Sequence, residues 1–185
     1  MIIEIPNYIS AETVSYIKET LNPFVDNAPS YTPTNNREGI SLAVSKTPEL
    51  RELDAKLFTI FSGIQQHIVQ PRYRPSYLSK DSGYEYHKYS PGDVCLYHSD
   101  GEVEATNDPS KSNLRYASVI LHLSTNEDGG DLIFPNQNKK IKTEAGKLVV
   151  FPPYGMFGHY TTPSETPREI MMTWFHYAKI AITEG

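Results

Sequence analysis

The chain has 185 residues, of which 38% are hydrophobic, and it carries a formal net charge of −5. This length predicts a single domain, residues 1–185, with enough apolar side chains to bury a core. The acidic balance argues against a groove for nucleic acid, because phosphate contacts require a basic surface. The apolar runs are shorter than the roughly 20 residues that span a membrane, and the first residues lack the pattern of a signal peptide.

Cys95 is the only cysteine, so the chain cannot form an internal disulfide. We therefore expect a reducing environment and a cytoplasmic location. The neighbours of Cys95 are apolar, and its parity along the chain is opposite to that of His98 and Asp100. This pattern predicts a buried strand residue that points away from those two side chains.

Residues 1–71 are expected to form a helical support region. A short strand over residues 2–5 is followed by a helix that Ser10 caps and that Pro23 stops after about residue 21. A strand is expected over residues 40–44. A second helix is expected over residues 48–69, with Pro71 ending it. Its apolar face is formed by Leu53, Leu57, Ile60, Phe61 and Ile64.

Residues 72–180 change to short strands separated by turns, which predicts a sandwich or jelly-roll core. The fold class is therefore mainly β with N-terminal helices. The segment 101–114 is polar and leaves directly from His98 and Asp100, so it is either a lid or an ordinary solvated loop. The strands are expected over residues 73–78, 84–89, 94–100, 116–123, 131–135, 141–144, 148–152 and 168–180.

A metal site is indicated by His98, Asp100 and His159. Side chains alternate faces along a strand, so His98 and Asp100 point the same way from the predicted strand 94–100. A third ligand must then come from another strand. The His-x-Asp pair alone is a weak signal, because such pairs also occur by chance on surfaces. Two histidines and one carboxylate leave coordination positions open, an arrangement that suits non-haem Fe(II) oxygenases.

Arg168 begins the last predicted strand, and Ile170 and Met172 mark its face as interior. A buried arginine needs a carboxylate partner, because an unpaired buried charge is costly. That partner is either an Asp or Glu of the protein or a dicarboxylate ligand that reaches towards the metal. The planar guanidinium, which grips a carboxylate through two hydrogen bonds, favours the ligand.

These residues belong to a stretch, residues 84–177, that resembles the prolyl 4-hydroxylase-like group of Fe(II)- and 2-oxoglutarate-dependent dioxygenases. No single motif is specific, but their combined order and spacing are. The matching pieces are Tyr89-Ser-Pro-Gly92, His98-Ser-Asp100, Arg115 before the apolar strand 117–123, Gly129-Gly130-Asp-Leu-Ile-Phe134-Pro135, Gly146-Lys-Leu-Val-Val-Phe151, His159, Arg168 and Trp174.

The resemblance implies a double-stranded β-helix, a jelly-roll or cupin-like core, in which His98, Asp100 and His159 bind Fe(II). It also implies that Arg168 binds the distal carboxylate of 2-oxoglutarate and that Tyr89 lies beside this co-substrate.

Two further residues are implied to lie near the co-substrate. Trp174 matches a tryptophan that lines the pocket. Plain core packing is the other interpretation, and both can be true. His122 stands where relatives often have tyrosine, so it either donates a hydrogen bond to 2-oxoglutarate or is a satisfied core histidine.

The reaction implied by the resemblance uses O2 and 2-oxoglutarate, releases succinate and CO2, and hydroxylates an unactivated C–H bond, with ascorbate as a reductant. We expect the substrate to be a prolyl residue in a peptide or protein. Tyrosines before and within the β-rich part can stack on proline rings or can be ordinary strand-surface residues. They are Tyr73, Tyr77, Tyr84 and Tyr86.

Three alternatives stay open at this point. The enzyme could act on a free amino acid or another small molecule. The chain could be a jelly-roll binding module without catalysis. The presence of all four of the main site residues argues against this; they are His98, Asp100, His159 and Arg168. It could also be a cupin-like metalloenzyme that does not use 2-oxoglutarate, which the position of Arg168 argues against.

Overall fold

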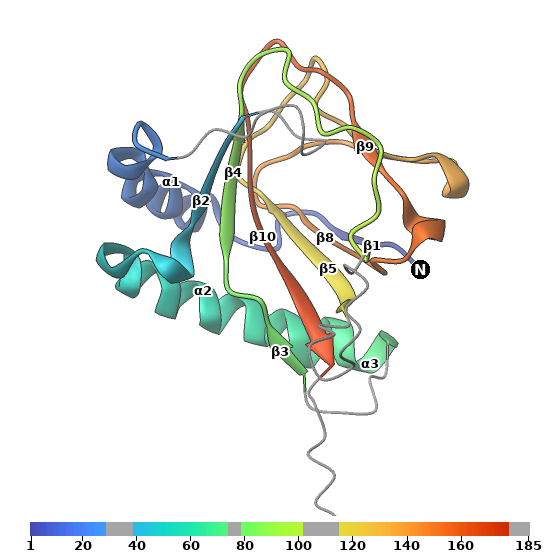
Figure 1. Ribbon diagram of the computed structural model, residues 1–185, viewed down its shortest axis with the longest axis horizontal. Helices are drawn as coiled ribbons and strands as arrows, with labels where there is room; N and C mark the ends of the chain where they lie inside the picture. The colour runs from blue at the N-terminus through green and yellow to red at the C-terminus, as the bar shows by residue number, and fades with distance from the viewer. Residues whose placement is uncertain (29–38, 74–78, 102–114, 178–185) are drawn as a thin grey trace, which may run out of the picture.

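A larger and a smaller antiparallel sheet face each other in the computed structural model of the chain, and helices cover the outer face of the larger sheet (Figure 1). The structure describes residues 1–28, 39–73, 79–101 and 115–177. This is the expected fold class, mainly β with N-terminal helices around a double-stranded β-helix.

The larger sheet contains strands from both the N-terminal and the C-terminal part of the chain, and all their pairings are antiparallel. β3 (Ser79–Asp81) also pairs with β10. The order is β1 (Ile3–Ile5), β8 (Leu148–Phe151), β5 (Arg115–His122), β10 (Arg168–Tyr177), β4 (Glu85–Tyr89) and β2 (Ile40–Ala43). The smaller sheet has the order β7 (Lys139–Ile141), β6 (Leu132–Phe134) and β9 (Tyr160–Thr161).

The helices are α1 (Ala11–Val25), α2 (Arg51–Ile64) and α3 (Gln70–Tyr73), with a π-helical segment over Gln65–Val69 between α2 and α3. The hydroxyl of Ser10 caps α1 by accepting a hydrogen bond from the Thr13 amide at 3.2 Å, as expected. Short 3₁₀ turns lie at Val44–Lys46, Pro48–Leu50, Pro135–Gln137 and Gly155–Phe157. The described helices include none that is long and apolar enough to cross a membrane.

The predicted helix ends were wrong in both cases, because neither proline stops its helix. α1 continues through Pro23 to Val25, which is buried in the core. The second helix continues through Pro71 to Tyr73. A proline near the end of a helix forfeits one backbone hydrogen bond, and apolar packing of the following residues can offset that loss.

Alternation along the central strands produces two cores. On β10, Met171 and Phe175 pack with the helices, whereas Ile170, Met172 and Trp174 pack towards the smaller sheet. On β5 and β8 the residues divide in the same way, which explains why β5 is apolar on both faces. The inner core, between the two sheets, holds the candidate site.

Several predicted strands differ from the observed ones. The segment 94–100 is not a regular strand, since only isolated bridges occur in it and Asp100 lies in a turn. Tyr73 lies in α3 rather than in a strand, and residues 74–78 are outside the described part. The short strand expected at 141–144 is β7, which ends at Ile141. Residues 102–114, the proposed lid, and residues 178–180 also lie outside the described residues.

Candidate metal and co-substrate site

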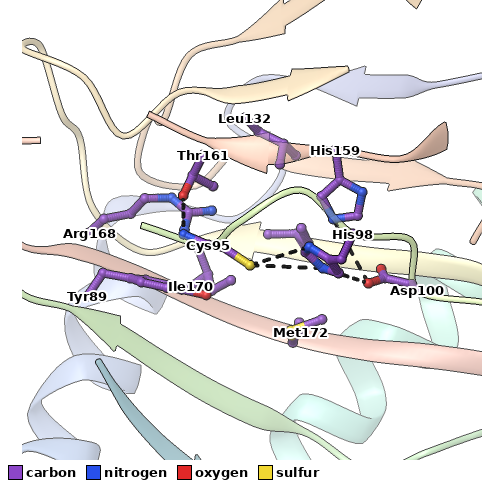
Figure 2. A pocket seen from close by; sticks show the side chains of 11 residues that line it. Tyr89, Cys95, His98, Asp100, Leu132, His159, Thr161, Arg168, Ile170 and Met172 are labelled. Atoms are coloured by element: carbon purple, nitrogen blue, oxygen red, sulfur yellow. Dashed lines mark hydrogen bonds and ion pairs between the residues drawn. The ribbon is translucent and has the colours of Figure 1, made fainter. Parts of the chain in front are cut away.

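A cavity between the two sheets is lined by residues from six parts of the chain, namely β4, the segment 95–100, β5, β6, the segment 159–161 and β10 (Figure 2). The space that protein atoms leave unfilled there is about 330 Å³, a volume that includes the open solvent at its mouth. The lining residues are Tyr89, Cys95, His98, Asp100, Ile120, Leu132, His159, Thr161, Arg168, Ile170 and Met172.

The three predicted metal ligands lie together at one end of this cavity. Ligand atoms of His98, Asp100 and His159 all lie within 4.8 Å of one another. Nε2 of His98 is 3.2 Å and Nε2 of His159 is 3.9 Å from Oδ1 of Asp100. The two histidines meet because their backbones form an antiparallel bridge, with N–H···O distances of 3.0 and 2.9 Å. This bridge joins segments that are distant in sequence.

Each histidine of the cluster is oriented by a nearby main-chain carbonyl. Nδ1 of His98 lies 2.8 Å from the Leu96 oxygen, and Nδ1 of His159 lies 3.1 Å from the Phe157 oxygen. A carbonyl can only accept, so both Nδ1 atoms carry a proton and donate it. Both Nε2 atoms face Asp100 and are therefore the nitrogens that would bind a metal ion, which is the usual outer-shell arrangement of metal-binding histidines.

The charges within the cluster favour a cation. Burial alone opposes ionisation of Asp100, but the hydrogen bond with His98 and the charge of His159 outweigh it and lower the pKa of Asp100. Burial also disfavours a protonated His98, yet its hydrogen bonds with Asp100 and Cys95 raise the pKa of His98 to about 10. A metal ion that binds here therefore displaces a proton from His98.

Arg168 lies at the other end of the cavity and is only 3% exposed. Its Nε and Nη1 have no hydrogen-bond partner among the described residues, and no described carboxylate pairs with it. The guanidinium lies 4.9 Å from the ring centroid of Tyr89. A Cβ atom at Gly130 would lie 3.2 Å from Cδ of Arg168, so the glycine leaves room for this side chain. The expected alternative, a protein carboxylate as partner, is not observed among residues 1–28, 39–73, 79–101 and 115–177.

Two predicted co-substrate residues lie behind the cavity rather than in its lining. His122 is fully buried, and neither ring nitrogen has a hydrogen-bond partner in the described structure. Burial and the charges of Arg168 and Lys147 lower its pKa well below the usual range, so His122 is neutral. Trp174 packs in the inner core at 5% exposure. Core packing of Trp174 is therefore observed.

Cys95 is buried as predicted, but the prediction that it points away from the ligands was wrong. It lines the cavity, and its Sγ lies 3.6 Å from Nδ1 of His98. The parity argument failed because the segment 94–100 is irregular. The irregular path also makes the Cys95 amide donate to Oγ1 of Thr161, at 2.8 Å.

Thr161 is a cavity residue that the sequence analysis missed. Its position two residues after His159 was the available signal, because alternate residues of a strand share a face.

The tyrosines that were considered for substrate stacking do not surround the cavity. Tyr84 and Tyr86 are buried in the outer core, where Tyr84 stacks on Phe61 with a centroid distance of 4.9 Å. The hydroxyl of Tyr86 donates to Glu169 at 2.7 Å. Both readings of these two residues, substrate contact and strand surface, were therefore wrong. Tyr77 lies outside the described residues.

Comparison with known proteins decides the family. Residues 84–176, half of the chain, match the model of the 2OG-Fe(II) oxygenase superfamily. The chain belongs to this superfamily. This oxygenase is a 2-oxoglutarate-dependent enzyme, and its cofactors are Fe(II) and 2-oxoglutarate. The matched range includes the cavity residues from Tyr89 to Met172.

The oxygenase is similar to proteins described as hydroxylases. A PKHD-type hydroxylase of Shewanella baltica is 25% identical over 170 residues, which cover 88% of this chain and 72% of the relative. A viral collagen prolyl hydroxylase of Paramecium Bursaria Chlorella virus-1, solved with 2-oxoglutarate, superposes with a TM-score of 0.72 at 18% identity, covering 96% of both chains. A Pseudomonas putida prolyl-4-hydroxylase gives a TM-score of 0.67 at 19% identity, covering 96% of this chain and 93% of that one.

Proposed function

We propose that this oxygenase hydroxylates an unactivated C–H bond of a prolyl residue in a peptide or protein, with release of succinate and CO2. The observation that carries the proposal is a buried arginine without a protein partner that shares one cavity with a cluster of two histidines and one aspartate. This pair of features fits a small dicarboxylate bound between a cation and a metal ion.

His98, Asp100 and His159 are the proposed iron ligands. Their donor atoms are close enough to share one ion, and both histidines present Nε2 to it. Three ligands on one side of a metal leave the remaining positions for the co-substrate and O2. Asp100 contributes a negative charge that partly neutralises Fe(II), and its Oδ2, which has no partner in the described structure, can accept a further contact.

Arg168 is the proposed anchor for the distal carboxylate of 2-oxoglutarate. Two of its donors are buried and unsatisfied, so a carboxylate that satisfies both recovers the cost of burying the charge. The ring of Tyr89 lies against the guanidinium, 4.9 Å from it. Neutral His122 retains one N–H, which it can donate to the same carboxylate, while Trp174 closes the pocket wall by packing.

With Fe(II) held by His98, Asp100 and His159, O2 would be the oxidant. One oxygen atom would enter succinate as 2-oxoglutarate loses CO2, the other would enter the C–H bond, and ascorbate would maintain Fe(II). The protein binds and orients the co-substrate, and its apolar walls keep water away from the reacting centre. Ile120, Leu132, Ile170 and Met172 provide these walls.

The prolyl substrate is supported by similarity of fold to two solved enzymes, a collagen prolyl hydroxylase and a prolyl-4-hydroxylase. Because identities below 25% establish the fold alone, the substrate needs a direct test. Purified enzyme with Fe(II), 2-oxoglutarate and ascorbate is incubated with proline-rich peptides, and mass spectrometry follows the gain of one oxygen atom. Asp100→Ala serves as the inactive control.

Oxygen incorporation at proline, coupled to succinate release, is the expected result. Succinate release that is stimulated only by free amino acids would replace the peptide by a small-molecule substrate. We also propose that residues 1–185 form one domain, in which 1–71 support the core 72–180, and that the enzyme acts in the cytoplasm, as its single cysteine suggests.

A further inference from the structure

A β-bulge places Arg115 on the inner face of the larger sheet. β5 and β10 pair regularly as far as Ala117 and Phe175, but His176 then pairs with Arg115 rather than with Tyr116. Tyr116 and Ala117 consequently both pack in the outer core. A bulge of this kind re-aims the next side chain. Arg115 therefore faces the same core as Trp174 instead of the helices.

The side chain of Arg115 is held from two directions. Its guanidinium carbon lies 3.9 Å from the ring centroid of Trp174, and its Nη1 donates to the main-chain carbonyl of Asp100 at 2.7 Å. The stack on a buried tryptophan fixes the plane of the guanidinium. The short, charge-assisted hydrogen bond then fixes the carbonyl of Asp100 relative to that plane.

The backbone of Asp100 depends on such a contact, because no strand ladder holds it. Asp100 lies in a turn that follows the isolated bridge at His98. On its other side, a Cβ at Gly101 would lie 2.7 Å from the carbonyl oxygen of Pro153, so the chain passes close to that residue. Arg115 and Pro153 therefore hold the turn that directs the Asp100 carboxylate at the two histidines.

We propose that Arg115 is a positioning residue for Asp100, which holds the carboxylate in line with His98 and His159 before a metal ion binds. The inference rests on the proposed function, in which Asp100 is an iron ligand. The hydrogen bond from Arg115 reaches the main chain of Asp100 rather than its carboxylate, so Arg115 acts through the ligand. Loss of an outer-shell partner of a metal ligand typically weakens metal affinity by about 10- to 100-fold.

The test compares Arg115→Ala, Arg115→Lys and Arg72→Ala with the wild type in the full chain. Arg72 is the matched control, because its Nη1 also donates to a main-chain carbonyl, that of Ile68 at 3.1 Å, but at the end of the helical region. Anaerobic calorimetry measures the affinity for Fe(II), and a second titration measures the affinity for 2-oxoglutarate at saturating Fe(II). The melting temperature of the metal-free protein reports on the fold.

Arg115→Ala is expected to weaken Fe(II) binding by about tenfold or more, with less than about a threefold change in 2-oxoglutarate affinity once iron is saturating. Arg115→Lys keeps a charged donor but loses the planar stack, so an intermediate loss is expected. Arg72→Ala is expected to match the wild type.

A folded Arg115→Ala protein that binds Fe(II) as tightly as the wild type overturns the inference. If Arg115→Ala does not fold, unchanged Fe(II) affinity in Arg115→Lys overturns it instead. Failure of the wild type to bind Fe(II) would be a failure of the proposed function. Normal binding by both the wild type and the variants refutes only the role of Arg115.

Discussion

Replacing Arg168 with alanine removes a buried guanidinium that lines the cavity. A hydrogen bond to a charged group contributes about 1.5–3 kcal/mol, so its loss corresponds to roughly 10- to 150-fold weaker binding of 2-oxoglutarate. The estimate applies because Arg168 is 3% exposed, and water cannot easily replace the lost donors. Ligands without a distal carboxylate should not be affected.

Replacement of Arg168 weakens co-substrate binding but is not expected to lower the stability of the ligand-free protein. Nε and Nη1 of Arg168 are buried without partners, so the ligand-free protein carries the cost of an unpaired charge. Arg168→Met, which keeps most of the side-chain volume, is therefore expected to leave the free energy of unfolding unchanged or higher. The additional stabilisation that 2-oxoglutarate confers on the wild type should shrink in this variant, because its affinity falls.

The assay is an anaerobic titration of each Fe(II)-loaded protein with 2-oxoglutarate and, separately, with pyruvate, which has the same 2-oxo acid group but no distal carboxylate. The reasoning predicts a large loss for 2-oxoglutarate and none for pyruvate. Equal 2-oxoglutarate affinity in Arg168→Ala and the wild type would refute the anchor. An equal loss for both ligands would mean that the substitution had damaged the metal site.

Three further outcomes are expected. His98→Ala or Asp100→Ala should abolish Fe(II)-dependent succinate production while the melting temperature shows an intact fold, and turnover that persists in either variant would contradict the metal assignment. Gly129 has φ 142°, and a Cβ there would collide with the carbonyl oxygen of Pro163. The substitution Gly129→Ala should therefore lower the free energy of unfolding, measured by denaturant titration, by about 1–3 kcal/mol. Gly155→Ala, which meets open space, is the control. Fe(II) affinity should fall as the pH is lowered from 8 to 6, since the raised pKa of His98 lets protons compete with the metal, and a flat profile would argue against binding by His98.

The parts of the site that could be predicted are those whose chemistry limits the residue types. The order His98, Asp100, His159 and Arg168 along the chain is compatible with few kinds of site. The structure brings the ligand atoms of the first three within 4.8 Å of one another. The inner face of β10 was also predictable, because strand side chains alternate regularly.

The errors occurred where the backbone departs from regular geometry. Cys95 was misplaced because the segment before His98 follows no strand period. Thr161 contacts this irregular segment through the Cys95 amide, and that contact depends on tertiary structure. The bulge that turns Arg115 inward depends on the partner strand β10, so no local pattern around Arg115 reveals it. Tyr84 and Tyr86 bury their rings and satisfy their hydroxyls with Asp81 and Glu169, contacts that depend on tertiary structure.

The most direct test of the central claim is an anaerobic titration of the metal-free protein with Fe(II) and then with 2-oxoglutarate, followed by visible absorption. The proposed site predicts a weak metal-to-ligand charge-transfer band that appears only when both are present, because 2-oxoglutarate must chelate an iron with open coordination positions. Iron binding without this band would contradict 2-oxoglutarate chelation at this site, and a protein that binds no iron would contradict the assignment of His98, Asp100 and His159 as its ligands.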